Sequence, residues 1–192
     1  MKTAPHYQNL SDAELLAKLI GVRESRLHYR GSLQPLFAAS PEEGVSHQKC
    51  AVAKELVRRF LEEELQHGDA LNSPGAVRDY LKLLLNAHEH EIFVVIFLDA
   101  RNQVIATEEM FRGTLTQTSV YPREVVKAAL KHNAASVILA HNHPSGVPEP
   151  SQSDRLLTDT LKQALSLVEV RVLDHFIVAG TQTLSLAEQG LM

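Results

Sequence analysis

The sequence has little cysteine, no tryptophan and no long apolar run. One cysteine, Cys50, cannot form a disulfide within the chain, and it excludes zinc modules built on several cysteines. The longest apolar run, residues 92–98, is far shorter than the roughly 20 residues that a helix needs to cross a bilayer. The first residues also lack the apolar stretch of a signal peptide. We therefore expect a cytoplasmic protein with no membrane segment.

An excess of positive charge is also missing. The chain has 19 lysines and arginines against 23 acidic residues, a net charge of -4. Proteins that bind DNA through phosphate contacts concentrate lysine and arginine on one face or segment. Nucleic-acid binding is therefore doubtful. The 44% hydrophobic and 22% charged residues are ordinary for a globular protein. The length of 192 residues allows one domain, or one domain and a small helical appendage.

The pattern changes near residue 70. In residues 1–70, Ser11 and Glu14 form a capping-box pattern, and apolar residues at helical spacing predict a second helix over about 47–66. The expected apolar face of that helix comprises Val52, Leu56, Phe60, Leu61 and Leu65. We interpret residues 1–70 as a small helical N-terminal segment, separated by a linker from a second domain over residues 71–192.

Helical and strand patterns alternate in residues 71–192. Apolar spacing and proline positions predict helices beginning at Pro74 and Pro122 and a third over about 153–167, with Leu130 on the inner face of the second. Runs rich in β-branched and aromatic residues predict strands at 92–98, 104–107, about 111–120, 136–140 and 170–179. This arrangement indicates the α/β class, with a mixed sheet packed against helices.

The segment after the strand at 136–140 carries the clearest chemistry. His141 and His143 lie two residues apart, so on extended backbone they point to the same side, and Pro144 favours that conformation. Asp154 begins the next helix, after a loop rich in glycine and proline. Two imidazoles and a carboxylate leave a fourth tetrahedral position for water, as in catalytic zinc sites.

Each of these residues also has a purely structural interpretation. A His-x-His pair often packs against its neighbours or lies on the surface. Asp154 at a helix start is commonly a cap or a partner of the helix dipole, and Ser151 and Ser153 are credible N-caps. The spacing alone leaves the metal site and these alternatives open.

The sequence His141-x-His143-Pro144, six residues, Ser151, two residues and Asp154 matches the JAMM signature. With motifs near 111–114, 121–124 and 173–175, residues 72–185 resemble the RadC-type branch of the MPN (JAB) metalloprotein family. The resemblance implies a cytidine-deaminase-like fold and one zinc ion per chain, held by His141, His143 and Asp154. It implies hydrolysis of a peptide or isopeptide bond in a peptide or protein substrate. Ser151 would donate a hydrogen bond to the oxyanion.

A glutamate must act as the general base. The resemblance places it at the start of an earlier strand, where Glu91 precedes Ile92, and we predict Glu91 for this role. The alternatives are Glu89, Glu108, Glu109 and Glu124.

Other polar residues are less informative. Asp174 and His175 lie within an apolar strand, and we interpret them as structural. His88 and His90 suggest a second metal site, although we expect them to be exposed.

Two rival functions remain: a DNA-repair-associated nucleic-acid-binding protein, and an inactive, metal-bearing binding module. RadC-type proteins often carry a helix-hairpin-helix-like segment with two glycines, whereas Gly44-Val45-Ser46 here has one, which argues against the first rival. The complete set of histidines, serine and aspartate argues against the second. The substrate and the oligomeric state are not determined by the sequence.

Overall fold

The computed structural model describes residues 7, 10–22, 33, 45–67, 70, 74–86, 88–113 and 120–192. Its contacts divide the chain into two units, Met1–Val57 and Arg58–Met192. The domain boundary expected near residue 70 stays a prediction. Gly44, which belongs to the expected hairpin turn, lies outside the described residues.

The first unit contains the predicted capping box. Helix α1 spans Asp12–Ile20, and its N-cap Ser11 accepts a hydrogen bond from the Glu14 backbone N–H while the Glu14 carboxylate accepts one from the Ser11 N–H. Gly21 ends the helix in a left-handed conformation, which glycine adopts without steric cost. This local prediction is confirmed.

Helix α3 spans Val45–His67, which confirms the second helix. Leu65 is buried, whereas Val52, Leu56 and Phe60 are 61%, 63% and 57% exposed. Helical spacing identifies residues that share a face, but it does not determine whether another element covers that face.

The second unit contains a five-stranded mixed sheet in the order β2-β1-β3-β4-β5. Its elements are α4 (Pro74–Leu85), β1 (Ile92–Leu98), β2 (Val104–Arg112), α5 (Pro122–Lys131), β3 (Ser136–Asn142), α6 (Gln152–Ser166), β4 (Arg171–Ala179) and β5 (Gln182–Ser185). Strands β3 and β4 are parallel, and the other neighbours are antiparallel. The predicted α/β class with a mixed sheet packed against helices is confirmed.

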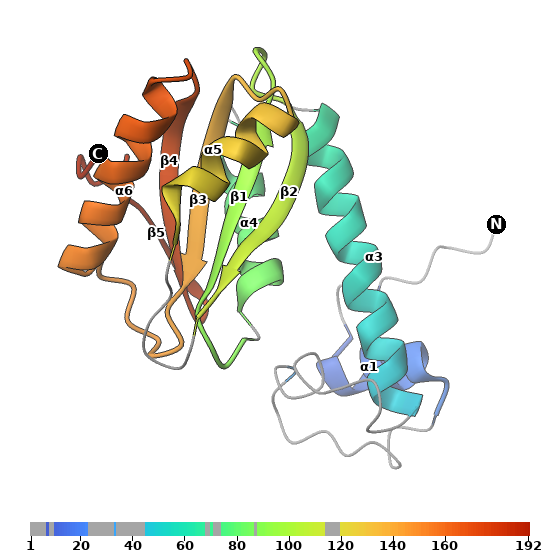
Figure 1. Cartoon of the computed structure of the whole chain (residues 1–192). Helices are drawn as coiled ribbons and strands as arrows, with labels where there is room; N and C mark the ends of the chain where they lie inside the picture. Colours follow the sequence, from blue (N-terminus) through green and yellow to red (C-terminus); the bar gives the residue numbers. More distant parts are fainter. Residues whose placement is uncertain are drawn as a thin grey trace. The chain divides into compact units, whose positions relative to one another are not determined.

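Both faces of the sheet are covered (Figure 1): α5 and α6 lie on one face and α4 lies on the other. In β1, Phe93, Val95 and Phe97 pack in the core on the α5 and α6 side, while the alternate residues pack in the core on the α4 side. Burial on both faces explains why residues 92–98 form an uninterrupted apolar run.

Three finer expectations differ from the structure. Phe111 and Arg112 do not begin a new strand, because they complete β2, and residues 114–119 lie outside the described residues. Leu130 is 57% exposed rather than inward, since the inner face of α5 consists of Val125, Ala128 and Ala129. The short edge strand β5 was not predicted; its outer residues are too polar and too few to give a pattern.

No helix within the described ranges has both the length and the apolar character that a bilayer span requires.

Candidate metal centre

The site forms where β3 ends. His141 pairs with Phe93 of β1 and with Ile177 of β4, so its backbone is fixed from both sides. The His143 N–H donates to the Val178 carbonyl over 2.8 Å, which extends this pairing past the end of β3. Both imidazoles therefore lie at the C-terminal end of β3, on the sheet face that α5 and α6 cover.

A tight turn redirects the chain after His143. The Gly146 N–H donates to the His143 carbonyl over 3.0 Å, and Gly146 has a φ of +77°, a conformation that favours glycine. The loop then reaches Ser151, the N-cap of α6, and Asp154 lies in the first turn of that helix. This return brings the carboxylate back to the histidines.

Side-chain atoms of three residues converge at this point. The distances are 2.9 Å between the Nε2 atoms of His141 and His143, 3.4 Å from His141 Nε2 to Asp154 Oδ1, and 3.5 Å from His143 Nε2 to Asp154 Oδ2. Ligands at zinc distances of about 2.0–2.2 Å in a tetrahedron lie about 3.3–3.6 Å from one another. The two nitrogen-to-oxygen distances match this spacing, whereas the nitrogen-to-nitrogen distance is shorter, and the donor set is that of a zinc site.

Asp154 is both a helix cap and a candidate ligand. Its Oδ2 accepts hydrogen bonds of 2.7 Å from both the N–H and the hydroxyl of Ser151, and its own N–H donates to Ser151 Oγ over 3.1 Å. The capping box fixes the orientation of the carboxylate, because Oδ2 is held toward the helix start. The structural and metal-binding interpretations are therefore compatible.

The ring of His143 is oriented by the loop. Its Nδ1 lies 2.7 Å from the Val147 carbonyl, which can only accept, so Nδ1 carries the proton of this bond. In the neutral ring, Nε2 then has the lone pair and faces the cluster. Holding the second nitrogen in this way is typical of histidines that bind metals.

His141 is oriented by two residues that we did not predict as part of the site. Its Nδ1 lies 2.9 Å from His175 Nε2, and His175 Nδ1 lies 2.7 Å from Thr158 Oγ1. The side chains of His175 and Thr158 are fully buried. Parallel pairing of β3 with β4 places His175 beside Leu139 and on the face of His141, a relation that requires the strand register.

The electrostatics follow from this crowding. Burial alone would raise the pKa of Asp154, but hydrogen bonds with His141 and His143 outweigh it and hold that pKa well below its usual range. The bond to Asp154 raises the pKa of His143, against the effect of burial. Burial, followed by the nearby charge of His141, lowers the pKa of His175 well below its ordinary value, so His175 is neutral. The cluster attracts one positive charge, either a proton on His143 or a metal ion.

Glu91 lies immediately before β1 and is half-buried. After the bond to Asp154 and the backbone bond to Val147, its negative charge is a further influence that raises the pKa of His143. The Glu91 carbonyl accepts a hydrogen bond of 2.8 Å from Gly113, so β2 supports this position. Alternation along β1 directs residue 91 to the same face as Phe93 and His141.

Asn142 fixes the segment that carries Glu91. Its Oδ1 accepts a hydrogen bond of 2.7 Å from the Ile92 N–H, and its Nδ2 donates to the His90 carbonyl over 3.0 Å. The side chain is 3% exposed and points to the opposite face from His141. Three consecutive residues of β3 and its extension therefore organise both the ligands and the candidate base.

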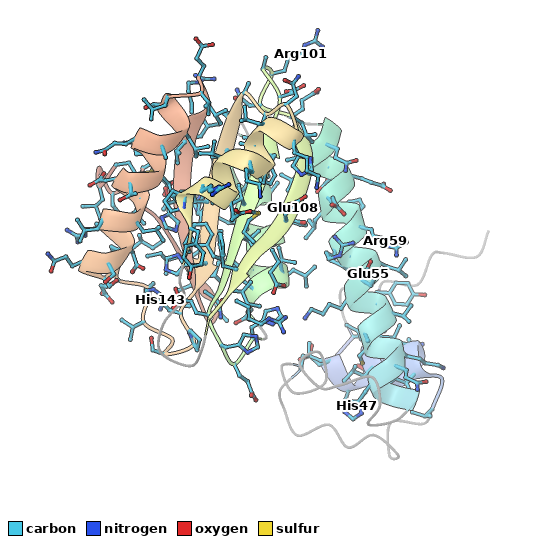
Figure 2. All side chains as sticks on the ribbon, viewed as in Figure 1. His47, Glu55, Arg59, Arg101, Glu108 and His143 are labelled. Atoms are coloured by element: carbon cyan, nitrogen blue, oxygen red, sulfur yellow. The ribbon has the colours of Figure 1, made fainter. Side chains whose placement is uncertain are left out.

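The other glutamates considered as bases have different settings. Glu89 is exposed, and Glu124, which is half-buried, pairs with Lys127. Glu109 pairs with Arg112, and Glu108 contacts His132 over 2.7 Å. Figure 2 shows Glu108 on β2, away from His143 at the end of β3. The geometry thus favours Glu91.

The second histidine pair does not form a comparable cluster. The rings of His88 and His90 make an edge-to-face contact with centroids 6.1 Å apart, and both are half-buried rather than exposed as expected. Among the described residues, the group of histidine, cysteine and acidic side chains with converging donor atoms comprises His141, His143 and Asp154, whose ligand atoms lie within 4.8 Å of one another.

Comparisons with known proteins agree with the resemblance seen in the sequence. A family model described as RadC-like JAB domain matches residues 71–191. A UPF0758 protein of Nitrosospira multiformis is 57% identical, over 100% of this chain and 93% of the relative. UPF0758 proteins of Herminiimonas arsenicoxydans and Nitrosomonas europaea are 57% and 51% identical, over 94% and 95% of this chain and 89% and 90% of their own lengths.

Proposed function

The chain belongs to the RadC-like JAB domain family, and from this premise we propose that it is a zinc-dependent hydrolase of the JAMM type. The bond it cleaves is a peptide or isopeptide bond in a peptide or protein substrate. One zinc ion per chain is held by His141, His143 and Asp154, and Glu91 and Ser151 act on the substrate beside it.

One observation carries this proposal: side-chain atoms of three residues, from β3, the loop and α6, converge with spacings of 2.9, 3.4 and 3.5 Å. Two nitrogens and one oxygen are a typical zinc donor set, and three protein ligands leave a position open for catalysis. The cluster is not sealed, since the side chain of His143 is 17% exposed and that of Asp154 is 11% exposed. A substrate carbonyl can approach from that side.

When bound, zinc lowers the pKa of a water ligand and polarises a carbonyl oxygen. The role of Glu91 is to accept the proton from water and to pass it to the amine that leaves. Its position just before β1, on the sheet face of His141, supports this role, because a general base must lie on the side where the water would bind. The Asn142 side chain holds the backbone on either side of Glu91.

Ser151 would donate to the oxyanion as the carbonyl carbon becomes tetrahedral. In the structure its hydroxyl donates to Asp154 Oδ2, which also accepts from the Ser151 N–H. The hydroxyl can therefore rotate toward a substrate while the backbone bond still orients Asp154. A single oxyanion donor of this kind typically contributes about 2.7–4 kcal/mol to the transition state.

The test begins with protein purified without chelators. Metal analysis should find about one zinc per chain, and a panel of peptides and isopeptide-linked conjugates should include a substrate that the protein cleaves. Removal of zinc should abolish that cleavage, and addition of zinc should restore it. A fully zinc-loaded protein that binds members of the panel and cleaves none would favour the inactive binding module instead.

A further inference from the structure

Behind His141 lies a chain of hydrogen bonds that crosses three elements of the fold. His141 of β3 contacts His175 of β4, His175 contacts Thr158 of α6, and the Thr158 hydroxyl contacts the Asp154 carbonyl, with distances of 2.9, 2.7 and 2.6 Å. The chain therefore begins at one candidate ligand and ends at the backbone of another. His141 is 1% exposed, and Thr158 and His175 are 0% exposed, so water does not compete for these bonds.

The direction of every bond in this chain can be assigned. The Asp154 carbonyl can only accept, so the single hydroxyl proton of Thr158 is donated there. Thr158 Oγ1 can then only accept from His175, which places a proton on His175 Nδ1. His175 is 0% exposed, and its two ring nitrogens contact a hydroxyl and an imidazole rather than a carboxylate, so its ring is neutral and its Nε2 accepts from His141 Nδ1.

We propose that Thr158 and His175 are positioning residues that hold His141 in its Nδ1–H tautomer and so reserve the Nε2 lone pair for the metal. The proposal rests on the metal-binding part of the proposed function and not on hydrolysis. A histidine that merely fills a core would accept either tautomer of its neighbour. Here the carbonyl at the end of the chain permits one tautomer only, because each bond determines the next.

The fold explains why this chain is directed. A threonine within a helix commonly donates its hydroxyl to the carbonyl four residues earlier, as Thr158 does to Asp154. Thr160 makes the same bond to the Leu156 carbonyl over 2.7 Å, but on the exposed side of α6. Only the buried threonine has its remaining acceptor capacity directed at a histidine. Thr160 is therefore a matched control from the same helix.

The decisive variants are Thr158→Val, Thr158→Ser and the control Thr160→Val. Valine preserves the shape of Thr158 but removes the acceptor. His175 can then carry its proton on Nε2 and donate it to His141 Nδ1, which forces His141 into the Nε2–H tautomer. Serine keeps the hydroxyl and should preserve the wild-type arrangement. His175→Gln can still place an acceptor near His141 Nδ1, whereas His175→Leu cannot.

Two measurements test the proposal. Two-bond ¹H–¹⁵N NMR spectra of the metal-free protein, recorded above the raised pKa of His143, report the tautomer of His141 directly. Wild type, Thr158→Ser and Thr160→Val should show the Nδ1–H form, and Thr158→Val should show a population of the Nε2–H form. Zinc titrations against a competing chelator should show an affinity loss of about 10–100-fold for Thr158→Val and His175→Leu. Thr158→Ser and Thr160→Val should stay near wild type, and His175→Gln should lose less than His175→Leu.

An Nε2–H tautomer of His141 in the metal-free wild type would overturn the proposal, and this measurement requires no variant to fold. Unchanged tautomer and zinc affinity in a folded Thr158→Val would overturn it as well. Absence of hydrolysis with the expected tautomers would count against the proposed function and leave this inference intact.

Discussion

The second unit contains two contacts between histidine and carboxylate that invite comparison. In one, His132 Nε2 lies 2.7 Å from Glu108 Oε1, and Lys131 reaches the same oxygen over 3.3 Å. In the other, two imidazoles meet Asp154, and each has its Nδ1 bonded to another group of the protein. The Glu108 side chain is 33% exposed, whereas that of Asp154 is 11% exposed.

The difference separates an ion pair from a metal site. Protons from His132 and Lys131 surround Glu108, so its charge is already balanced by donors. The cluster at the end of β3 instead has lone pairs that face one another, and these require a cation between them. We expect changes in the cluster to affect metal binding and catalysis, and changes in the pair to affect stability only slightly.

The largest effect is expected from removing both imidazoles. The double variant His141→Ala/His143→Ala should lose stoichiometric zinc and all zinc-dependent hydrolysis, because a lone carboxylate cannot hold the ion. Metal analysis after gel filtration measures the loss. His132→Ala, which removes the histidine of the ion pair, should keep the full zinc content. A double variant that retains one zinc per chain would place the metal elsewhere.

A second test contrasts two carboxylates. Glu91→Gln keeps the shape of the side chain but cannot accept a proton, so the rate should fall by about 10²–10⁴-fold while zinc content and fold are unchanged. Glu108→Gln is the matched control and should hydrolyse at the wild-type rate. Loss of zinc in Glu91→Gln would identify Glu91 as a ligand instead. A wild-type rate in Glu91→Gln, with a loss in Glu89→Gln, would assign the base to Glu89.

Asn142 allows a test of how the base is positioned. Asn142→Ala leaves the buried Ile92 N–H without its partner, which should lower the free energy of unfolding by about 1–3 kcal/mol. Displacement of Glu91 should also lower the rate by up to about 10²-fold, with zinc retained.

Denaturant titrations and kinetics measure these two effects of Asn142→Ala. In a Glu91→Gln background, Asn142→Ala should have no further effect on the rate. An equal additional loss in that background would show that Asn142 does not act through Glu91.

The pH dependence of the metal-free protein sharpens the comparison. Asp154 raises the pKa of His143 above its unfolded value of about 6.5. The stability from this contact is therefore complete below about pH 6.5 and is lost as the pH rises through the folded pKa. The pKa of Asp154 is lowered, so its own contribution is present above an unfolded value of about 3.9 and is lost as the pH falls through its folded pKa.

Asp154→Asn should therefore destabilise the chelator-treated protein by about 1.5–3 kcal/mol near pH 5, and by less near pH 8. Urea titrations at the two pH values measure this difference. The opposite trend of His175, whose pKa is lowered by burial, is present in both proteins and largely cancels. Equal losses of stability at both pH values would show that Asp154 does not stabilise the protonated form of His143.

The smallest effect is expected from Glu108→Gln. The hydrogen bond from His132 is the largest cause that lowers the pKa of Glu108. The contribution to stability is thus present above an unfolded pKa of about 4.3 and disappears as the pH falls through the folded pKa. Because Glu108 is partly exposed, the loss near pH 7 should be less than about 1 kcal/mol, measured by denaturant titration. A loss as large as that of Asp154→Asn would remove the contrast between the two contacts.

Local patterns predicted much of the fold. The apolar run at 92–98, the capping box at Ser11, the N-cap at Ser151 and the proline at the start of α5 depend on interactions within a few residues. The exposure of Val52, Leu56 and Phe60 on α3 could not be predicted, because burial depends on which element covers a helix. Residues 111–112 were assigned to a separate strand because the length of β2 is set by its pairing with β1.

The sequence by itself determined the three candidate ligands, the serine and the class of fold. Their spacing is local: two histidines on one strand, a turn at Gly146, and a carboxylate in a helix cap. The tertiary structure decided which groups form hydrogen bonds to the candidate ligands and to the segment that carries Glu91. Thr158, His175 and Asn142 act across α6, β4 and the segment before β1, so their roles depend on strand register and helix packing. Side chains far apart in the sequence acquire hydrogen-bond partners only when the sheet forms, and no local pattern specifies the direction in which those bonds run.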